Sequence, residues 1–158
     1  MVIAFLKQAY FPDNIGGAEV STHCMASAMV KQNHDVSVYS DFRNIRKSRA
    51  LGWKFNYKQC SIAIPVPARF QQWLYTYLPS LWKELLYHCL RPRLKKDRPD
   101  VLQIVHIWPW ISAAGLIRKR LGIPVIIRCV GDDIQVSEEV SYGVGRDRVK
   151  RKLLADGF

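Results

Sequence analysis

Residues 2–40 read VIAFLKQAYFPDNIGGAEVSTHCMASAMVKQNHDVSVYS, and this stretch decides the fold. Val2–Leu6 is a short apolar run of strand-forming residues, and a polar segment with Pro, Asn and Gly follows it. From Gly17 the apolar residues recur at helical spacing, and Asn33 and His34 close that helix. Asp35–Ser40 then alternates like a second strand. The stretch therefore predicts a β-α-β unit of about 40 residues.

The same order of elements returns in the second half of the chain. Val101–Ile107 has the pattern of a strand, and Ser112–Leu121 has that of a helix with its first residue as N-cap and Gly122 as C′ residue. Pro124–Cys129 is almost continuously apolar, which is typical of a strand covered on both faces. Arg146–Ala155 predicts another helix. The expected fold is α/β and doubly wound (Rossmann-like), with a mostly parallel sheet and helices on both faces.

The middle of the chain is less regular. Phe42–Tyr57 is basic and poor in strand-forming residues, which predicts a loop, and Ser61–Val66 predicts a third strand. Between Phe70 and Leu94, apolar pairs recur every four residues and give a helical segment a broad apolar surface. Pro79 either kinks this segment or starts a second helix within it.

Length and composition indicate one globular domain. The chain has 158 residues, of which 49% are hydrophobic and 23% charged, and these proportions exclude a disordered chain. Four widely spaced cysteines without a Cys-x-x-Cys pair suit a reduced, cytoplasmic protein better than a disulfide frame or a zinc site. The N-terminus lacks the basic region of a signal peptide. The longest uncharged run, Val101–Ile117, is short for a membrane span and is split by Pro109.

The formal net charge of +11 points to anionic partners. The basic excess falls in blocks, at residues 41–60, 83–98, 118–128 and 146–158. Such clustering favours nucleic acid, an acidic membrane surface or a phosphorylated substrate, and charge alone does not choose among them.

Three loops carry candidate binding residues. Gly16 and Gly17 stand where a helix follows the first strand, a place where backbone N–H groups can meet a phosphate or diphosphate, although an ordinary glycine-rich turn has the same pattern. Glu19 either caps this first turn or accepts a hydrogen bond from a ligand hydroxyl. His106 and Trp108 stand at the C-terminal end of the Val101–Ile107 strand. An imidazole there could bind sugar hydroxyls or move a proton, and an indole could stack on a sugar. The alternative is a core histidine and packing tryptophans.

Gly131, Asp132 and Asp133 follow the Pro124–Cys129 strand at the same predicted edge of the sheet. Paired carboxylates can bind a metal, accept hydrogen bonds from hydroxyls or cap a turn. Because no third acidic or histidine ligand stands at a fixed spacing, the sequence predicts no metal site.

Residues 70–96 combine aromatic side chains with a basic tail. Aromatic residues together with Lys and Arg are what an interfacial helix uses against anionic lipid. The alternative is a helix pair that packs on the sheet and leaves a solvated basic end. Under the first interpretation, the residues in contact with membrane or acceptor are Trp73, Trp82, Arg91, Arg93, Lys95 and Lys96.

Seven stretches, taken in order, carry a resemblance to a known family: Ile3–Leu6, Tyr10–Pro12, Gly16–Glu19, His34–Ser40, Arg98–His106, Leu121–Ile127 and Gly131–Ile134. Their order and spacing are similar to those of the N-terminal domain of family 4 glycosyltransferases with the GT-B fold. The resemblance covers nearly the whole chain and is least clear between residues 42 and 97.

The resemblance implies the acceptor-binding half of a retaining enzyme that transfers a sugar from a nucleotide-sugar donor to a lipid-linked or polysaccharide acceptor in cell-envelope glycan synthesis. In that family the paired glycines lie against the donor diphosphate, here Gly16 and Gly17, and a catalytic metal or other cofactor is usually absent. A basic, apolar surface holds the N-terminal domain on the inner face of the cytoplasmic membrane.

Two departures from the family pattern matter. Val130 stands where the family commonly has a histidine near the donor sugar, which makes His106 the candidate catalytic residue. The chain also ends before a nucleotide-binding C-terminal domain, so residues 1–158 are expected to form a single incomplete unit with little activity alone. The alternative is a non-catalytic basic module for anionic membrane or nucleic acid. Nucleic acid is disfavoured because the aromatic residues fall on an amphipathic helix rather than on an exposed strand face.

Overall fold

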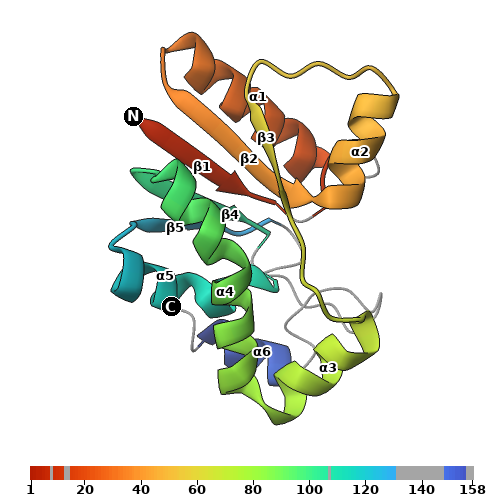
Figure 1. The fold of residues 1–158 in the computed structure, drawn as a ribbon, viewed down its shortest axis with the longest axis vertical. Coiled ribbons are helices and arrows are strands. Elements are labelled where there is room, and N and C mark those ends of the chain that lie inside the picture. Colours follow the sequence, from red (N-terminus) through yellow and green to blue (C-terminus); the bar gives the residue numbers. More distant parts are fainter. Residues whose placement is uncertain (8, 13–14, 107, 131–147, 156–158) are drawn as a thin grey trace.

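A parallel sheet forms the centre of the molecule (Figure 1). The computed structural model describes residues 1–158 except 8, 13–14, 107, 131–147 and 156–158. In chain order the described elements are β1 (Val2–Leu6), α1 (Gly17–Lys31), β2 (Asp35–Asp41), α2 (Phe42–Ala50), β3 (Lys58–Ile62), α3 (Ala68–Tyr77), α4 (Pro79–Asp97), β4 (Val101–Val105), the 3-10 turn η1 (Trp110–Ala113), α5 (Ala114–Leu121), β5 (Val125–Arg128) and α6 (Arg148–Ala155).

The described strands are ordered β3-β2-β1-β4-β5, and every neighbouring pair is parallel. Strand β1 lies at the centre: Phe5 stands beside Val38 of β2 on one side and beside Gln103 of β4 on the other. The order of the strands therefore reverses direction between β1 and β4. In open α/β sheets this reversal opens a crevice at the carboxyl ends of the strands.

Helices cover both faces of the sheet. Successive residues of a strand point to opposite faces, and in β1 Ile3 and Phe5 join a cluster that includes Ala26 of α1. Leu6 joins the cluster on the other face, which includes Leu86 of α4 and Ile117 of α5. Both faces of β1 are thus buried, which explains its unbroken apolar sequence. The predicted doubly wound α/β fold is confirmed.

Two predictions in the middle of the chain are wrong. The expected loop at Phe42–Tyr57 contains helix α2, which begins after Asp41, whose carboxylate accepts a hydrogen bond from the Arg43 N–H at 2.9 Å. Within α2, Ile45 and Ser48 are buried while the basic residues face solvent, so a basic composition marks an exposed helix face here. The third strand runs over Lys58–Ile62 rather than Ser61–Val66, because its pairing with β2 begins beside Ser37.

The boundaries of the helices test three of the sequence predictions. Pro79 starts α4, and Gly122 ends α5 in the left-handed conformation at φ 69°. Ser112 is not an N-cap, because it lies inside the 3-10 turn and α5 begins at Ala114.

Strand β5 lies at the end of the described sheet, so it is not covered on both faces as predicted: Ile126 is 53% exposed.

Candidate functional site

The carboxyl ends of β1, β4 and β5 bring together residues from distant parts of the chain. Lys7 follows β1, His106 follows β4, and Arg128 ends β5. Helix α1 starts near the same edge, because the chain enters α1 after it leaves the carboxyl end of β1. This edge lies at the switch point between β1 and β4, so it is the candidate site.

Gly16 and Gly17 form the turn into α1, and an added Cβ atom would meet different surroundings at the two positions. Gly16 is the N-cap residue of α1, and its backbone is extended at φ −118°. A Cβ at Gly16 would lie 2.7 Å from Oε2 of Glu19, so a larger residue there would force the Glu19 carboxylate to shift. A Cβ at Gly17 would meet no described atom within 4 Å. The space beside the Gly17 backbone is therefore open to a ligand.

Glu19 is held by groups of the protein itself. Its Oε2 accepts a hydrogen bond from the Gly16 N–H at 3.0 Å, and its Oε1 lies 3.0 Å from Nζ of Lys7. Both side chains of this ion pair are buried. Burial alone would raise the pKa of the Glu19 carboxyl, but the hydrogen bonds and charge of Lys7 and nearby backbone N–H groups together hold it below its ordinary value. Glu19 therefore caps the first turn of α1, which is one of the two roles that the sequence allowed for it.

The ion pair also sets the electrostatics of the turn. A carboxylate at the start of α1 would repel a phosphate, but the ammonium group of Lys7 compensates its charge. The positive end of the helix dipole and the first backbone N–H groups of α1 then dominate the local field. The turn can therefore hold an anion despite its glutamate.

Arg128 was not among the residues that the sequence indicated. Its guanidinium donates to Oγ of Ser21 at 2.6 Å and contacts Sδ of Met25 at 3.1 Å, which fixes a cation of β5 against the first half of α1. The only sequence signal is a single arginine at the end of an apolar run. The backbone N–H of His106 donates to the Arg128 carbonyl at 3.3 Å.

His106 has a left-handed backbone at φ 68°, a conformation that is uncommon for residues other than glycine. Its side chain is half-buried at the carboxyl end of β4. A strained residue at a sheet switch point is a candidate for function rather than for packing. The structure thus places His106 and the glycine turn at the same edge of the sheet.

A chain of polar side chains positions the loop before the glycines. The Tyr10 and Tyr57 hydroxyls lie 2.7 Å apart, and the Tyr57 hydroxyl lies 2.8 Å from Nδ1 of His23 on α1. Burial raises the pKa of Tyr10 to about 12 and raises that of Tyr57 further, so both phenols keep their protons. Sequence analysis did not find this chain, because its members come from three separate segments.

Both tryptophans after β4 make packing contacts, and stacking of Trp108 on a sugar stays a prediction. Trp110 is fully buried in the core. Trp108 is half-buried, with its ring centroid 4.9 Å from that of Tyr75 and 6.4 Å from that of Trp82. Nζ of Lys150 lies 5.6 Å from the Trp108 ring. These contacts place Trp108 among α3, α4 and α6.

The predicted loop residues Gly131, Asp132 and Asp133 lie outside the described residues. Within the described ranges no group of three or more His, Cys, Asp or Glu side chains could hold a metal ion. The prediction of a substrate-binding acidic loop therefore stays a prediction.

The predicted membrane-contact residues separate into three groups. Trp82 was wrongly assigned, because its side chain is completely buried in the core between α4 and the sheet. Trp73 is 48% exposed on α3. Arg91, Lys95 and Lys96 are exposed and Arg93 is half-buried, but they lie in the last turns of α4, next to the amino ends of the strands (Figure 1).

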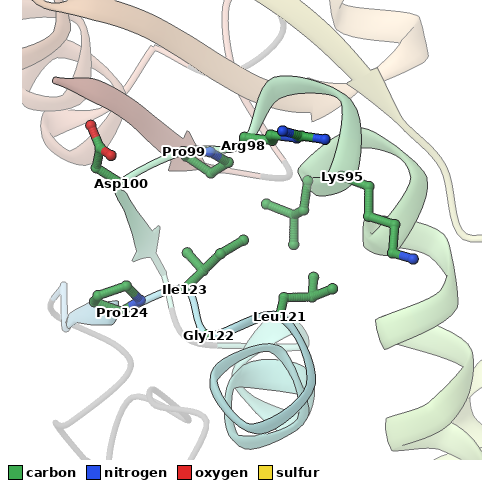
Figure 2. Close-up of a pocket in the computed structure, with 9 residues that line it drawn as sticks. Lys95, Arg98, Pro99, Asp100, Leu121, Gly122, Ile123 and Pro124 are labelled. Atoms are coloured by element: carbon green, nitrogen blue, oxygen red, sulfur yellow. The ribbon is translucent and has the colours of Figure 1, made fainter.

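A cavity of about 570 Å³ lies at this amino edge. Figure 2 shows Lys95, Arg98 and Asp100 around it, with Leu121–Pro124 forming the opposite wall. The Asp100 carboxylate accepts a hydrogen bond from the N–H of Val2, the first residue of β1, at 2.7 Å. The basic tail and this cavity are thus at the end of the sheet opposite to the glycine turn.

Residues 15–149 match the family model of Glycosyltransferase Family 4. The chain belongs to this family. No curated protein sequence matches this family 4 chain. Among the described residues, no helix is both long enough and apolar enough to cross a bilayer.

Solved glycosyltransferase structures resemble the family 4 domain in fold. They include MurG of Acinetobacter baumannii, with 16% identity, a TM-score of 0.52 and coverage of 80% of this chain and 34% of that chain. The glycosyltransferase VinC in complex with DTDP has 14% identity and a TM-score of 0.52, covering 99% of this chain and 38% of that one. CalG4, the calicheamicin glycosyltransferase, has 11% identity and a TM-score of 0.52, covering 98% and 41%. The family 4 chain thus spans 34% to 41% of the length of these proteins and has the fold of a GT-B N-terminal domain.

Proposed function

We propose that this chain is the acceptor-binding half of a retaining glycosyltransferase, which transfers a sugar from a nucleotide-sugar donor to a lipid-linked or polysaccharide acceptor in cell-envelope glycan synthesis. Family membership supports the class of reaction. The observation that carries the site is the open space beside Gly17 at the start of α1, above the switch point of the sheet. We place the donor diphosphate there.

The chemistry of the turn suits a diphosphate. The first N–H groups of α1 point out of the helix start, where the helix dipole favours negative charge. Lys7 compensates the charge of Glu19, so this carboxylate does not repel the ligand. The donor is a substrate, and we propose that transfer needs no metal ion or further cofactor.

His106 is the proposed catalytic or sugar-binding residue. It directly follows β4 at the carboxyl edge of the sheet, with a left-handed backbone at φ 68°. A neutral imidazole can accept a hydrogen bond from a sugar hydroxyl, and the other ring nitrogen can donate one. Gly131, Asp132 and Asp133 are proposed to contact the same substrate from the loop after β5.

We further propose that a second domain supplies the nucleotide pocket. The solved relatives are much longer than this chain, which spans 34% of the MurG structure and 38% of VinC. We therefore expect the 158-residue chain to bind the diphosphate weakly and to catalyse little or no transfer by itself. We place the protein in the cytoplasm, at the inner face of the membrane that carries its acceptor.

Replacing Gly17 by Ala is expected to weaken binding of inorganic pyrophosphate, the group shared by nucleoside-diphosphate sugars, at least tenfold. The added methyl group would occupy space that the protein leaves open. Folding should not suffer, because alanine suits a helix better than glycine. Isothermal titration calorimetry with pyrophosphate measures the effect.

Gly115→Ala is the matched control, because Gly115 is also a helical glycine whose Cβ would meet no described atom within 4 Å. This variant should bind pyrophosphate like the wild type. Equal binding by the Gly17→Ala and Gly115→Ala variants would remove the glycine turn from the donor site.

A further inference from the structure

Helix α2 and the turn after it form a basic surface. Residues 42–57 contain no Asp or Glu, and their basic residues are all exposed: Arg43, Arg46, Lys47, Arg49 and Lys54. Arg43, Arg46 and Arg49 follow one another three residues apart, which places neighbouring Cβ atoms about 5–6 Å from each other on a helix. Among the described residues, no carboxylate forms an ion pair with these three arginines. Such a row of guanidinium groups attracts an anion.

Trp53 follows this helix, and the way α2 ends fixes its position. Gly52 is left-handed at φ 70°, and its N–H donates to the Arg49 carbonyl at 3.1 Å. The N–H of Trp53 donates to the Ser48 carbonyl at 3.0 Å. These two hydrogen bonds form a Schellman motif, in which glycine suits the left-handed position. Trp53 therefore leaves α2 in a defined direction.

The indole of Trp53 packs on two other rings and still is 41% exposed. Its centroid lies 5.5 Å from that of Phe11 and 6.2 Å from that of Phe55. Phe11 is in turn tied to α2, because the hydroxyl of Ser48 donates to the Phe11 carbonyl at 3.1 Å. An exposed ring that is held in this way is oriented before a ligand arrives, which lowers the entropic cost of stacking on it.

The α2 surface, which we define as Arg43, Arg46, Arg49 and Trp53, lies on the side of the candidate site. Helix α2 follows β2 directly, so it begins at the carboxyl edge of the sheet (Figure 1). Phe11, which contacts Trp53, belongs to the segment that leads from the end of β1 to the glycine turn. A ligand on the α2 surface would therefore be bound at the same edge as the proposed donor.

The chemistry of the α2 surface suits an acidic sugar chain better than a lipid. A helix that enters a bilayer interface needs an exposed apolar face, and the only exposed apolar residue described in α2 is Ala50. Arginine instead presents a planar fork that binds a carboxylate through two hydrogen bonds. An exposed indole offers a flat apolar face to the C–H groups of one sugar ring. Carboxylates attached to sugar rings are the groups of a uronic acid.

We infer that the α2 surface binds an acidic polysaccharide, whose sugars carry uronic acid carboxylates. Charge complementarity selects this partner: the arginines bind carboxylates along the chain, and Trp53 stacks on one of its sugar rings. The inference rests on the proposed function and deepens it, because it specifies that the polysaccharide acceptor is acidic.

The test is isothermal titration calorimetry of the 158-residue chain with two acidic probes, oligogalacturonate and oligoglucuronate, and with neutral maltohexaose. The wild type should bind at least one acidic probe, and should bind maltohexaose about tenfold more weakly or less. The triple variant Arg43→Gln/Arg46→Gln/Arg49→Gln should lose affinity for the acidic probe on the order of 30-fold, from about threefold for each exposed ion pair.

The matched control is Lys31→Gln/Arg118→Gln/Lys119→Gln. It removes the same charge from the last turns of α1 and α5, which lie at the amino edge of the sheet. Its affinity for the acidic probe should fall less than about threefold.

The stacking contact is tested by a second matched pair. Trp53 and Trp73 are exposed to similar degrees, 41% and 48%, but only Trp53 belongs to the α2 surface. Trp53→Ala should weaken binding of the acidic probe about fivefold, and Trp73→Ala should leave it unchanged. Equal affinities of these two variants would contradict the stacking contact.

Equal losses in the two triple variants would overturn the inference, because they would indicate binding through net charge. Absence of binding to both acidic probes would overturn it too. Tighter binding of an oligouridylate of equal charge would also overturn it, since the partner would then be a nucleic acid. Pyrophosphate binding by the wild type and by Gly17→Ala tests the proposed function separately, so either result can fail while the other holds.

Discussion

Replacing Lys7 by Met is expected to lower the free energy of unfolding by about 3–5 kcal/mol, because the substitution leaves the buried Glu19 carboxylate without its counter-charge. Replacing Glu19 by Leu should cost a similar amount, since the buried ammonium of Lys7 then lacks its partner. Urea unfolding at pH 7, followed by far-UV circular dichroism, measures both losses.

The double variant Lys7→Met/Glu19→Leu is the control. It removes both charges together, so neither remains buried and unpaired, and most of the lost stability should return. Losses that simply add in the double variant would show that the two side chains do not act as a buried ion pair.

The same pair predicts a dependence of stability on pH. The pKa of Glu19 lies below its ordinary value in the folded protein, so the folded state favours the ionised carboxyl. Its contribution is present above the unfolded value, about 4.3, and is lost as the pH falls through the lower folded value. Glu19→Gln should therefore flatten the acid limb of the stability curve below about pH 4, and an unchanged limb would contradict the assignment.

Trp82→Ala should lower the free energy of unfolding by about 3–5 kcal/mol, whereas Trp73→Ala should change it by less than about 1 kcal/mol. The side chain of Trp82 on α4 is completely buried in the core, with its ring near those of Tyr75 and Trp108, and its removal leaves a cavity. Trp73 is 48% exposed on the neighbouring helix. Urea unfolding measures the free energy of unfolding of both variants. Because both replace Trp by Ala, the residue type does not differ between them.

The contrast separates a core residue from a surface residue within one segment. Similar losses from the two variants would contradict the burial that the structure gives to Trp82.

The sheet could be predicted because its pattern is simple and local. Val2–Leu6 and the alternation of Asp35–Ser40 identify two strands, and the helical periodicity between them gives the crossover. Helix α2 could not be predicted in this way, because Ile45 and Ser48 are its only described buried residues among basic neighbours. The exposure of Ile126 was also hidden, since a sequence does not show which strand ends a sheet.

The candidate site was predictable only where its signal was local. Gly16 and Gly17 stand together and mark a turn, whereas Arg128 reaches Ser21 across a separation of 107 residues. Lys7 and Glu19 likewise meet only when α1 folds back over β1. Trp73 and Trp82 belong to one periodic apolar pattern in the sequence. The structure divides this segment into two helices at Pro79, and Trp82 is buried whereas Trp73 is exposed.

We expect the glycine turn at the carboxyl edge to hold a nucleotide-sugar diphosphate. An amide chemical-shift map of the isotope-labelled chain, recorded during titration with pyrophosphate and with thymidine diphosphate, tests this expectation. The largest shifts are expected at Gly16–Ala18, with smaller shifts at His106. Largest shifts at Lys95, Arg98 and Gly122, around the cavity at the amino edge, would contradict it, as would the absence of any shift at millimolar ligand.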